Sequence, residues 1–421
     1  SDRHVATGFV VGGTQANSVL RQRMLRDSVG GPAEYLCHLL DWSVAFLERR
    51  QPDMLFFYAV AGAPALALIE AARVMDIRVR VLTTTRVASR FVVDTDPYGG
   101  LARPVQLFHA AREGRAELSP SEHQFGYEFL KEFRNQPISP GYMNDVNKRL
   151  KSLTPLRVLF RLALRSASIW KRGYYTTLRH DPVYSSIDQI QTSFRRKMKG
   201  LEEKYSTSVL PRDRRYIYYP LHVDPEASTM VAAPWHTDQL AVIEGIAKSL
   251  PLDCCLVVKE HAPMIGKRPR GFYRRIARMP RVLLASHRHS SFDLIRNASL
   301  VCAITGTAGW EAALLGVPSL VFGKPHYTHL PQGVRQCSDL SELPRVLPEA
   351  MNQDACPERD LELFIAAIHA CSFELPSGFL WGTTELDHSV WNDCARNMAN
   401  AIMASLHVPL SVHSQTELEK R

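Results

Sequence analysis

The feature that most constrains the fold is a regular alternation of short apolar runs and helical segments between Tyr216 and Phe322. Apolar, β-branched runs of four to six residues are typical of buried strands, and each run here is followed by a segment with helical spacing. Strands that alternate with helices form a parallel sheet with helices on both faces. We therefore expect an α/β fold, with strands at Tyr216–Tyr219, Leu256–His261, Val282–Ala285, Leu300–Ile304 and Ser319–Phe322, and helices at Thr237–Ser249, Gly271–Arg278, Phe292–Asn297 and Trp310–Leu315.

The first 112 residues show the same pattern less clearly. Apolar runs predict strands at Thr7–Val11, Met54–Val60 and Arg78–Leu82, and Thr83–Arg86 would follow the last of these. Helical spacing predicts a helix over Tyr35–Arg49, and Pro64 is suited to the first turn of a helix that ends near Val74. A Gly-x-Gly-x-x-Gly fingerprint is absent from this half, so we expect no dinucleotide site there.

The chain divides into four predicted parts. These are a first α/β domain (1–112), a basic and largely helical insertion (113–210), a second α/β domain (211–383), and a terminal helix, Asp387–Leu406, followed by a polar tail (384–421).

The insertion contains a segment, residues 146–180, with nine Lys or Arg and no acidic residue. Two interpretations are open: a helical insertion with solvated charges, or a basic amphipathic face that rests on an anionic membrane surface. No nucleic-acid recognition motif accompanies the charge, so we expect no nucleic-acid partner.

Composition narrows the class of partner and the compartment. A formal net charge of +9 and a pI near 9.2 favour anionic partners. The eight cysteines show no paired metal spacing and lie mostly in apolar runs, as expected of reduced thiols. No run of 18 apolar residues occurs, and the start, Ser1-Asp-Arg-His4, does not resemble a signal peptide. We expect a cytoplasmic protein, peripheral on the inner face of the inner membrane if the basic segment binds lipid.

Polar side chains gather where the predicted strands of the second half end. Ligands of open parallel sheets bind at the carboxyl ends of the strands. Those ends carry His222, Glu226, Ser228, Thr229, Lys259, His261, Thr305 and Thr307.

The turn Thr305-Gly-Thr-Ala-Gly309 lies between a predicted strand and a predicted helix. Small residues let backbone N–H groups approach a phosphate or carboxylate at a helix N-terminus, and the two threonine hydroxyls add donors. The alternative is a tight strand-to-helix turn in which Thr307 is only the N-cap. Glu311, in the first turn of that helix, either caps its own helix or accepts ribose hydroxyls.

Two further groups carry candidate site residues. His261 would donate to a phosphate oxygen and Lys259 would add positive potential. In the loop that contains His222, the side chains of Glu226, Ser228 and Thr229 would hold a base, ribose or phosphate, or would only cap a helix. A basic rim is expected from Lys267, Arg268 and Arg270.

Several catalytic signatures are missing. The sequence has no nucleophile elbow with a Ser-His-Asp triad, no Walker A motif and no His-Glu-x-x-His. Asp94-Thr-Asp96 matches the Asp-x-Asp metal signature of sugar transferases, but it is predicted to lie in a loop away from the crevice, so we expect no metal site.

Three motifs together resemble the bacterial capsule polysaccharide biosynthesis proteins, a glycosyltransferase-like group that includes Kdo transferases. The motifs are Pro220-Leu-His-x-x-Pro-Glu-Ala-Ser-Thr229, Val258-Lys-Glu-His261 and Thr305-Gly-Thr-Ala-Gly-Trp-Glu-Ala312. The resemblance implies a GT-B-like fold, in which two Rossmann-like domains with parallel sheets face a cleft and the second domain holds a nucleotide-sugar donor. It implies that the final helix returns to the first domain.

The resemblance also implies residue roles. His261 maps to the histidine at the donor phosphate, and the threonine-glycine turn maps to Thr305, Gly306 and Thr307. The chain departs from the family motif after His261, where Ala262 stands in place of proline and Pro263 follows.

The resulting hypothesis is a metal-independent glycosyltransferase that moves a sugar, for example Kdo, from a CMP- or UDP-linked donor to a glycan or glycolipid. His261 and Lys259 would be catalytic, and Gly306, Gly309 and Arg86 would complete the substrate site, with no cofactor. A carboxylate of the first domain would be the base or nucleophile, and Glu34, Asp41 and Glu70 are the candidates. The alternatives are a polyol-phosphate transferase, a nucleotide-sugar epimerase, or a non-catalytic subunit of a polysaccharide assembly complex.

Overall fold

The computed structural model describes residues 31–58, 60, 63–137, 204–211, 214–224, 226–269, 271–376 and 388–406. The expected strand at Thr7–Val11, the basic segment 146–180 and Arg270 lie outside these residues.

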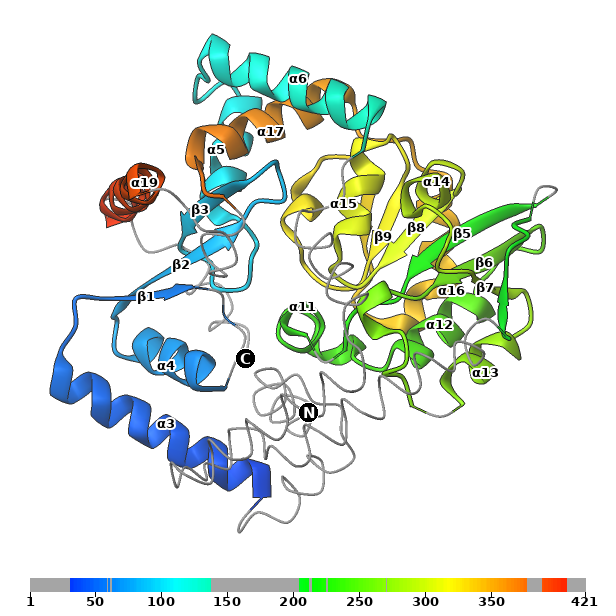
Figure 1. Ribbon diagram of the computed structural model, residues 1–421, viewed down its shortest axis with the longest axis horizontal. Helices are drawn as coiled ribbons and strands as arrows, with labels where there is room; N and C mark the ends of the chain where they lie inside the picture. The colour runs from blue at the N-terminus through cyan, green and yellow to red at the C-terminus, as the bar shows by residue number, and fades with distance from the viewer. Residues whose placement is uncertain are drawn as a thin grey trace.

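The larger of two sheets has seven strands in the order β10-β9-β8-β5-β6-β7-β4, and every neighbouring pair is parallel (Figure 1). The predicted α/β class with a parallel sheet is therefore confirmed. The two short edge strands, β4 and β10, were not predicted. The strands are β4 (Ser206–Thr207), β5 (Arg215–Pro220), β6 (Cys254–Lys259), β7 (Val282–Ala285), β8 (Leu300–Ala303), β9 (Ser319–Val321) and β10 (Val334–Gln336).

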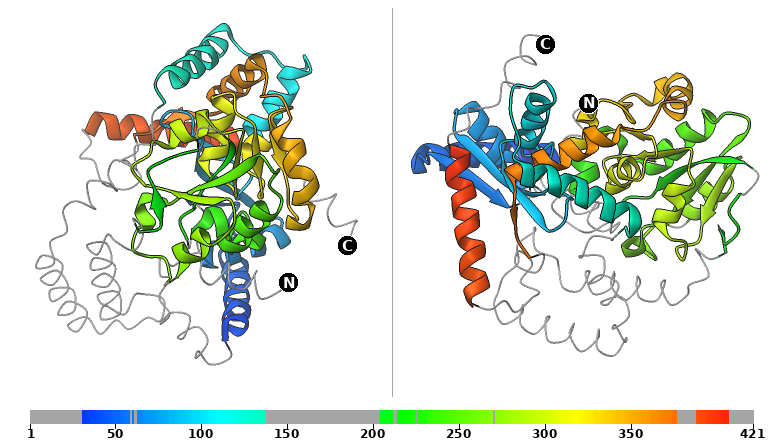
Figure 2. Two further views of the ribbon diagram at one scale, coloured as in Figure 1. Left: turned by 90° about the vertical axis from the view of Figure 1, so that its right-hand side faces the viewer. Right: turned by 90° about the horizontal axis from the view of Figure 1, so that it is seen from above.

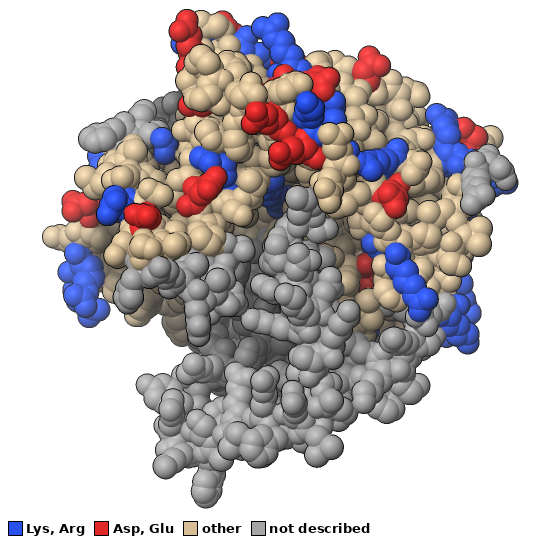
Figure 3. All heavy atoms as spheres, turned by 45° about the horizontal axis from the view of Figure 1, so that its top comes forward, with Lys and Arg blue, Asp and Glu red and all other residues tan. Residues whose placement is uncertain are grey.

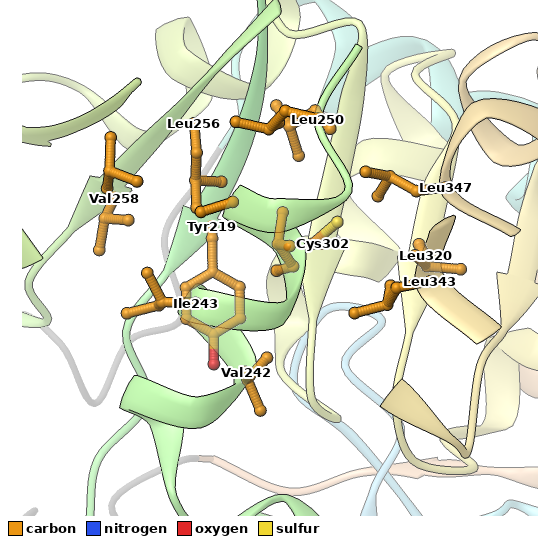
Figure 4. Packing of buried hydrophobic residues seen from close by; sticks show 14 of the residues in the cluster. Tyr219, Val242, Ile243, Leu250, Leu256, Val258, Cys302, Leu320, Leu343 and Leu347 are labelled. Atoms are coloured by element: carbon orange, nitrogen blue, oxygen red, sulfur yellow. The ribbon is translucent and has the colours of Figure 1, made fainter. Parts of the chain in front are cut away.

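Helices cover both faces of this sheet because its strands alternate their side chains between two cores. On β5, Ile217 and Tyr219 belong to one hydrophobic cluster with α12 (Gln239–Lys248), α13 (Phe272–Ala277) and α16 (Leu343–Met351). Figure 4 shows Tyr219 beside Val242 and Ile243 of α12. Tyr216 and Tyr218 point the other way, into a cluster with α14 (Ser291–Arg296) and α15 (Thr307–Leu314).

The smaller sheet is mixed rather than parallel throughout. Its order is β1-β2-β3-β11, with β1 and β2 parallel and both pairings of β3 antiparallel. The cause is the short connection between β2 and β3, since only antiparallel neighbours can be joined by so few residues. The strands are β1 (Met54–Tyr58), β2 (Arg78–Thr84), β3 (Arg90–Asp94) and β11 (Phe373–Glu374), and the helices before and after β1 are α3 (Gly31–Arg50) and α4 (Ala63–Val74).

Three helices connect the two sheets: α5 (Ala102–Arg112), α6 (Pro120–Asn135) and α17 (Glu358–Cys371). They lie together at the top of Figure 1 and lie against one another in both views of Figure 2. One hydrophobic cluster joins Phe108 of α5 and Leu130 of α6 to Trp310 of α15 and Phe364 of α17. The two sheets are therefore linked by a continuous core on this side.

The chain then returns to the smaller sheet. Strand β11 pairs with β3 although it lies within the range 211–383 expected for the second domain, because α17 has already carried the chain across. Helix α19 (His388–Leu406) packs against β3 and β11. Its end is held by the fully buried Arg80, whose Nε and Nη2 donate to the Ser405 carbonyl at 3.0 and 2.7 Å. The four-part division of the chain stays a proposal.

Short helical turns occupy the remaining connections, and none of the described helices is both long and apolar enough to cross a membrane. On the face drawn in Figure 3, basic and acidic side chains are interspersed. The short elements are α11 (Ala227–Met230), η1 (Pro234–His236), η2 (Ala262–Met264), η3 (His326–His329) and η4 (Leu340–Glu342).

Candidate functional site

The strand order of the larger sheet reverses between β5 and β8, the position at which open parallel sheets have their ligand crevice. The chain proceeds from β5 to β6 and β7 on one side, and the later strands β8, β9 and β10 lie on the other side. Such a reversal of strand order lets the loops after the two central strands diverge, and ligands bind there. Those loops carry His222 after β5 and the turn Thr305–Gly309 after β8.

His222 lies at this crevice as a buried, neutral histidine. Its Nε2 accepts the Ile304 N–H at 3.3 Å, which assigns the ring proton to Nδ1. Burial first, and then the charges of His261, Arg268 and Arg86, lower the pKa of His222 to about 3. Nδ1 is buried and has no hydrogen-bond partner among the described residues. A buried N–H donor without a partner is uncommon, and an acceptor oxygen of a water molecule or a ligand would satisfy it.

The turn after β8 approaches His222 closely. A Cβ on Gly306 would lie 2.8 Å from Nε2 of His222, so only glycine fits there. Gly306 is the N-cap of α15, and no side chain caps that helix, so the alternative with Thr307 as N-cap is wrong. Gly309 admits Tyr327, whose hydroxyl donates to the Gly306 carbonyl at 2.7 Å. The first backbone N–H groups of α15 are therefore presented at the crevice without a competing side chain.

One predicted ligand donor instead joins the two loops, and another bonds within its own loop. The Thr305 hydroxyl donates to the Ser228 carbonyl, and the Thr229 hydroxyl donates to the Glu226 carbonyl at 3.1 Å. Thr305 and Thr229 are buried, whereas Ser228 is half-buried and donates to the exposed Glu226 carboxylate at 2.6 Å. Glu226 and Ser228 remain accessible from solvent, while the two threonine hydroxyls are used within the protein.

Arg86 reaches this crevice from the other sheet. It lies in the connection between β2 and β3, which the Thr85 hydroxyl stabilises by bonds to Val87 and Arg90. Arg86 adopts φ of 62°, a left-handed conformation that is costly for a residue with a Cβ. Its Nη1 donates to the Thr305 carbonyl at 3.2 Å. The structure thus places a guanidinium from the smaller sheet against the turn that follows β8 of the larger sheet.

Lys259 lies on the face of the larger sheet that α14 and α15 cover. Its Nζ donates to Ser291 Oγ at 2.8 Å. Burial lowers the pKa of Lys259 to about 8, although the nearby Glu311 carboxylate opposes the shift. Burial also raises the pKa of Glu311, against the Thr307 hydroxyl bond and the charges of Arg86 and Lys259. These groups are consequently coupled by charge across the site.

His261, two residues beyond Lys259, lies at a small hollow of about 90 Å³. Burial lowers the pKa of His261, with the Glu260 carboxylate acting in the opposite direction. His287 lines the same hollow and was not among the predicted site residues. The signal was present, because Ser286-His-Arg-His289 directly follows β7, at the same edge of the sheet.

Glu260 and Arg268 form a buried ion pair on the opposite face, so Arg268 is not part of a basic rim. Strand alternation turns Glu260 away from Lys259 and toward α13. Arg268 Nε lies 2.8 Å from Glu260 Oε2, and the two side chains are 2% and 0% exposed. Lys267, the neighbouring residue, is exposed.

Two of the three candidate catalytic carboxylates have other surroundings in the part of the chain that the structure describes. Asp41 is exposed on α3, Glu70 is bonded to Tyr98 and Arg73, and the side chain of Glu34 lies outside what is described. Within the described ranges no group of three metal-binding side chains occurs.

The pair Asp94 and Asp96 has other partners. Asp94 ends β3 instead of lying in a loop, and burial raises its pKa to about 6. Asp96 accepts the backbone N–H groups of Tyr98 and Gly100, at 2.9 and 2.6 Å.

Residues 173–340 match the sequence profile of a family described as "Capsule polysaccharide biosynthesis protein". This range spans the whole larger sheet and both loops of the crevice. The resemblance inferred from the three motifs is thereby confirmed. No curated protein sequence matches the chain.

Solved structures with similar folds include two transferases and an epimerase. They are the Thermosulfurimonas dismutans KpsC β-Kdo 2,7-transferase (14% identity, 77% of this chain and 79% of that chain covered, TM-score 0.41) and 2,4-transferase (15% identity, 74% and 78%, TM-score 0.40). A UDP-GlcNAc 2-epimerase of Methanocaldococcus jannaschii, solved with UDP-GlcNAc and UDP, has 10% identity, covers 80% of each chain and has a TM-score of 0.29.

Proposed function

We propose, from the match of residues 173–340 to the capsule polysaccharide biosynthesis family, that this chain is a glycosyltransferase of surface polysaccharide assembly. It would transfer a sugar from a CMP- or UDP-linked donor to a glycan or glycolipid. The peripheral contact of residues 146–180 with anionic lipid and the cytoplasmic location are part of the same proposal.

The observation that carries the proposal is the donor set at the crevice between β5 and β8. The Nδ1–H of His222 has no partner among the described residues, and the opposite ring nitrogen, Nε2, lies against Gly306 at the uncapped start of α15. The Nδ1–H and the first backbone N–H groups of α15 are hydrogen-bond donors suited to anionic oxygens of a nucleotide. Arg86 and Lys259 add positive charge, and both act to lower the pKa of Glu311, although burial raises that pKa on balance.

This donor set suits the chemistry of sugar transfer. Negative charge develops on the phosphate of the departing nucleotide as the glycosidic bond to it breaks. Fixed donors and cations in a partly desolvated site stabilise that charge without reorganising. We assign the phosphate contacts to His261, Lys259 and the start of α15, a role that would make a metal ion unnecessary.

The first test is a thermal-shift screen of the intact protein with CMP, UDP, CDP and GDP, because a ligand that binds only the folded state raises Tm. We expect CMP, and next UDP, to raise Tm most. Turnover with a panel of nucleotide sugars follows, and its product is a new glycosidic bond. A phosphodiester product, or a free epimerised sugar, would contradict the proposal.

The His261→Ala variant tests the phosphate role. Loss of one charge-stabilising donor is expected to lower kcat by about 10²–10³. His123→Ala, which removes an exposed histidine on α6, is the control and should leave turnover unchanged. Equal turnover of wild type and His261→Ala would remove His261 from the site.

A further inference from the structure

We propose that Glu260 and Arg268 form a positioning clamp that sets the loop of His222 relative to the loop of His261. The inference rests on the proposed function only in taking these two histidines as parts of the donor site. Neither Glu260 nor Arg268 was predicted to have this role.

The clamp uses both oxygens of one carboxylate. Glu260 Oε1 accepts the His261 N–H at 2.7 Å and Arg268 Nη2 at 3.0 Å. Oε2 accepts Arg268 Nε at 2.8 Å and the Tyr273 hydroxyl at 2.8 Å. The carboxylate therefore fixes the backbone of His261 directly while it holds the guanidinium in a bidentate geometry.

The guanidinium continues the connection to the other histidine. Arg268 Nη2 also donates to the His222 carbonyl at 2.6 Å, and the guanidinium lies 4.9 Å from the centre of the Phe272 ring. One ion pair thus bonds the backbone of both histidine residues, which are distant in sequence. Gln239 completes the hold on His222, since its side chain accepts the His222 N–H at 2.8 Å.

Burial is what makes this arrangement rigid. Both charged side chains are almost fully excluded from solvent, so a departure of either partner would leave an uncompensated charge. Arginine is also specific here, because it presents several N–H groups in a fixed fork. A lysine has one nitrogen and cannot keep both the bidentate contact with Glu260 and the bond to the His222 carbonyl.

The experiment compares histidine labelling in Arg268→Lys, Glu260→Gln and wild type. Diethylpyrocarbonate modifies neutral imidazoles, and mass spectrometry of peptides reports each histidine separately. In Arg268→Lys we expect His222 to react about tenfold faster while His261 is unchanged. In Glu260→Gln both histidines should react faster. Arg268→Lys keeps a cation beside Glu260, so it is the variant to use if Glu260→Gln does not fold.

Two controls separate positioning from general loosening. Asp253→Asn removes the exposed Arg215–Asp253 ion pair at the opposite end of β5 and β6, and should change no labelling rate. His236 and His326, both buried in the same half of the chain, are internal references. Unchanged labelling of His222 in folded Arg268→Lys would overturn the clamp, and so would an equal rise at His236 and His326.

A binding measurement connects the clamp to the site. Calorimetric Kd values for CMP and UDP should rise about tenfold in Arg268→Lys and stay constant in Asp253→Asn. If wild type binds neither nucleotide, the proposed function fails, and the labelling result still decides the clamp. If nucleotide affinity is unaffected while His222 becomes reactive, the role of the clamp in donor binding is refuted.

Discussion

Lys259 and His222 differ in how burial changes their charge near neutral pH. Burial keeps His222 uncharged throughout the physiological range, because its pKa falls to about 3. Lys259 keeps a pKa of about 8, so it is largely protonated at neutral pH and largely neutral in mild alkali. A neutral hydrogen-bond donor and a titratable cation therefore lie at the carboxyl ends of the neighbouring strands β5 and β6.

The pH dependence of anion binding follows from Lys259. Since the ammonium form attracts phosphate, the affinity for CMP is expected to fall as pH rises through about 8, by up to tenfold per unit. Calorimetric titrations between about pH 6.5 and pH 9.5 measure this. The Lys259→Met variant should bind weakly at every pH and lack that decline. A wild-type affinity that is constant over the range would show that the Lys259 ammonium does not contact the ligand.

The titration of Lys259 changes the stability of the fold with pH in the direction opposite to its effect on anion affinity. A lysine whose folded pKa is lowered binds fewer protons than in the unfolded chain between about pH 8 and its ordinary value of 10.5. Stability rises with pH wherever the unfolded chain binds more protons than the folded chain. The free energy of unfolding therefore increases as pH rises through that window. Weaker binding of the anion at alkaline pH would consequently not be explained by unfolding caused by deprotonation of Lys259.

At the scale of elements, the centre of the larger sheet was predictable and its edges were not. Strand β7 was predicted at its observed bounds, Val282–Ala285, because an apolar run between polar turns identifies a buried strand. Strands β10 and β11 have three and two residues, too few for any periodicity, and their pairing depends on tertiary contact. The mixed order of the smaller sheet likewise depends on the tight Thr85–Ser89 connection, whose conformation no apolar pattern specifies.

Helix α6 lies within the range 113–210 that was expected to be largely helical, but its bounds were not predicted although its start is encoded locally. Pro120 is the first helical residue after the N-cap Ser119, a position that suits proline. Glu122 completes a capping box with Ser119. For the site, the position of His287 after β7 was readable from the sequence, whereas the pairing of Arg268 with Glu260 and the His222 carbonyl could not be assigned before the loops were seen to meet.

The start of α15 yields a prediction about packing. A Cβ on Gly309 would lie 2.6 Å from the Tyr327 hydroxyl oxygen, so Gly309→Ala must displace Tyr327 and its bond to Gly306. We expect a loss of about 1–3 kcal/mol in the free energy of unfolding. Urea titration measures it. The Gly309→Ala/Tyr327→Leu double variant should lose less than the sum of the single changes, and strict additivity would contradict this contact as the cause.

At the scale of the whole molecule, Arg86 is the point where one sheet contributes to the crevice of the other. Its strained backbone allows two effects to be separated, because glycine tolerates φ of 62° and alanine does not. Both Arg86→Gly and Arg86→Ala lose the guanidinium, so both should bind CMP about tenfold more weakly.

The stabilities of these two variants should differ although their binding defects agree. Arg86→Gly is expected to be more stable than Arg86→Ala by about 0.5–1 kcal/mol, measured by urea unfolding. If both variants bind CMP as tightly as wild type does, Arg86 only holds the Thr305 carbonyl and does not contribute to binding. Equal stability of the pair would show that the loop relaxes on substitution.

The cluster that joins α5, α6, α15 and α17 has a practical consequence. The aromatic rings of Phe108, Trp310 and Phe364 meet there, drawn from early and late parts of the chain. If the gene were divided between the two sheets, each fragment would expose the apolar residues of this cluster to water and would aggregate. The polypeptide is best expressed and studied whole.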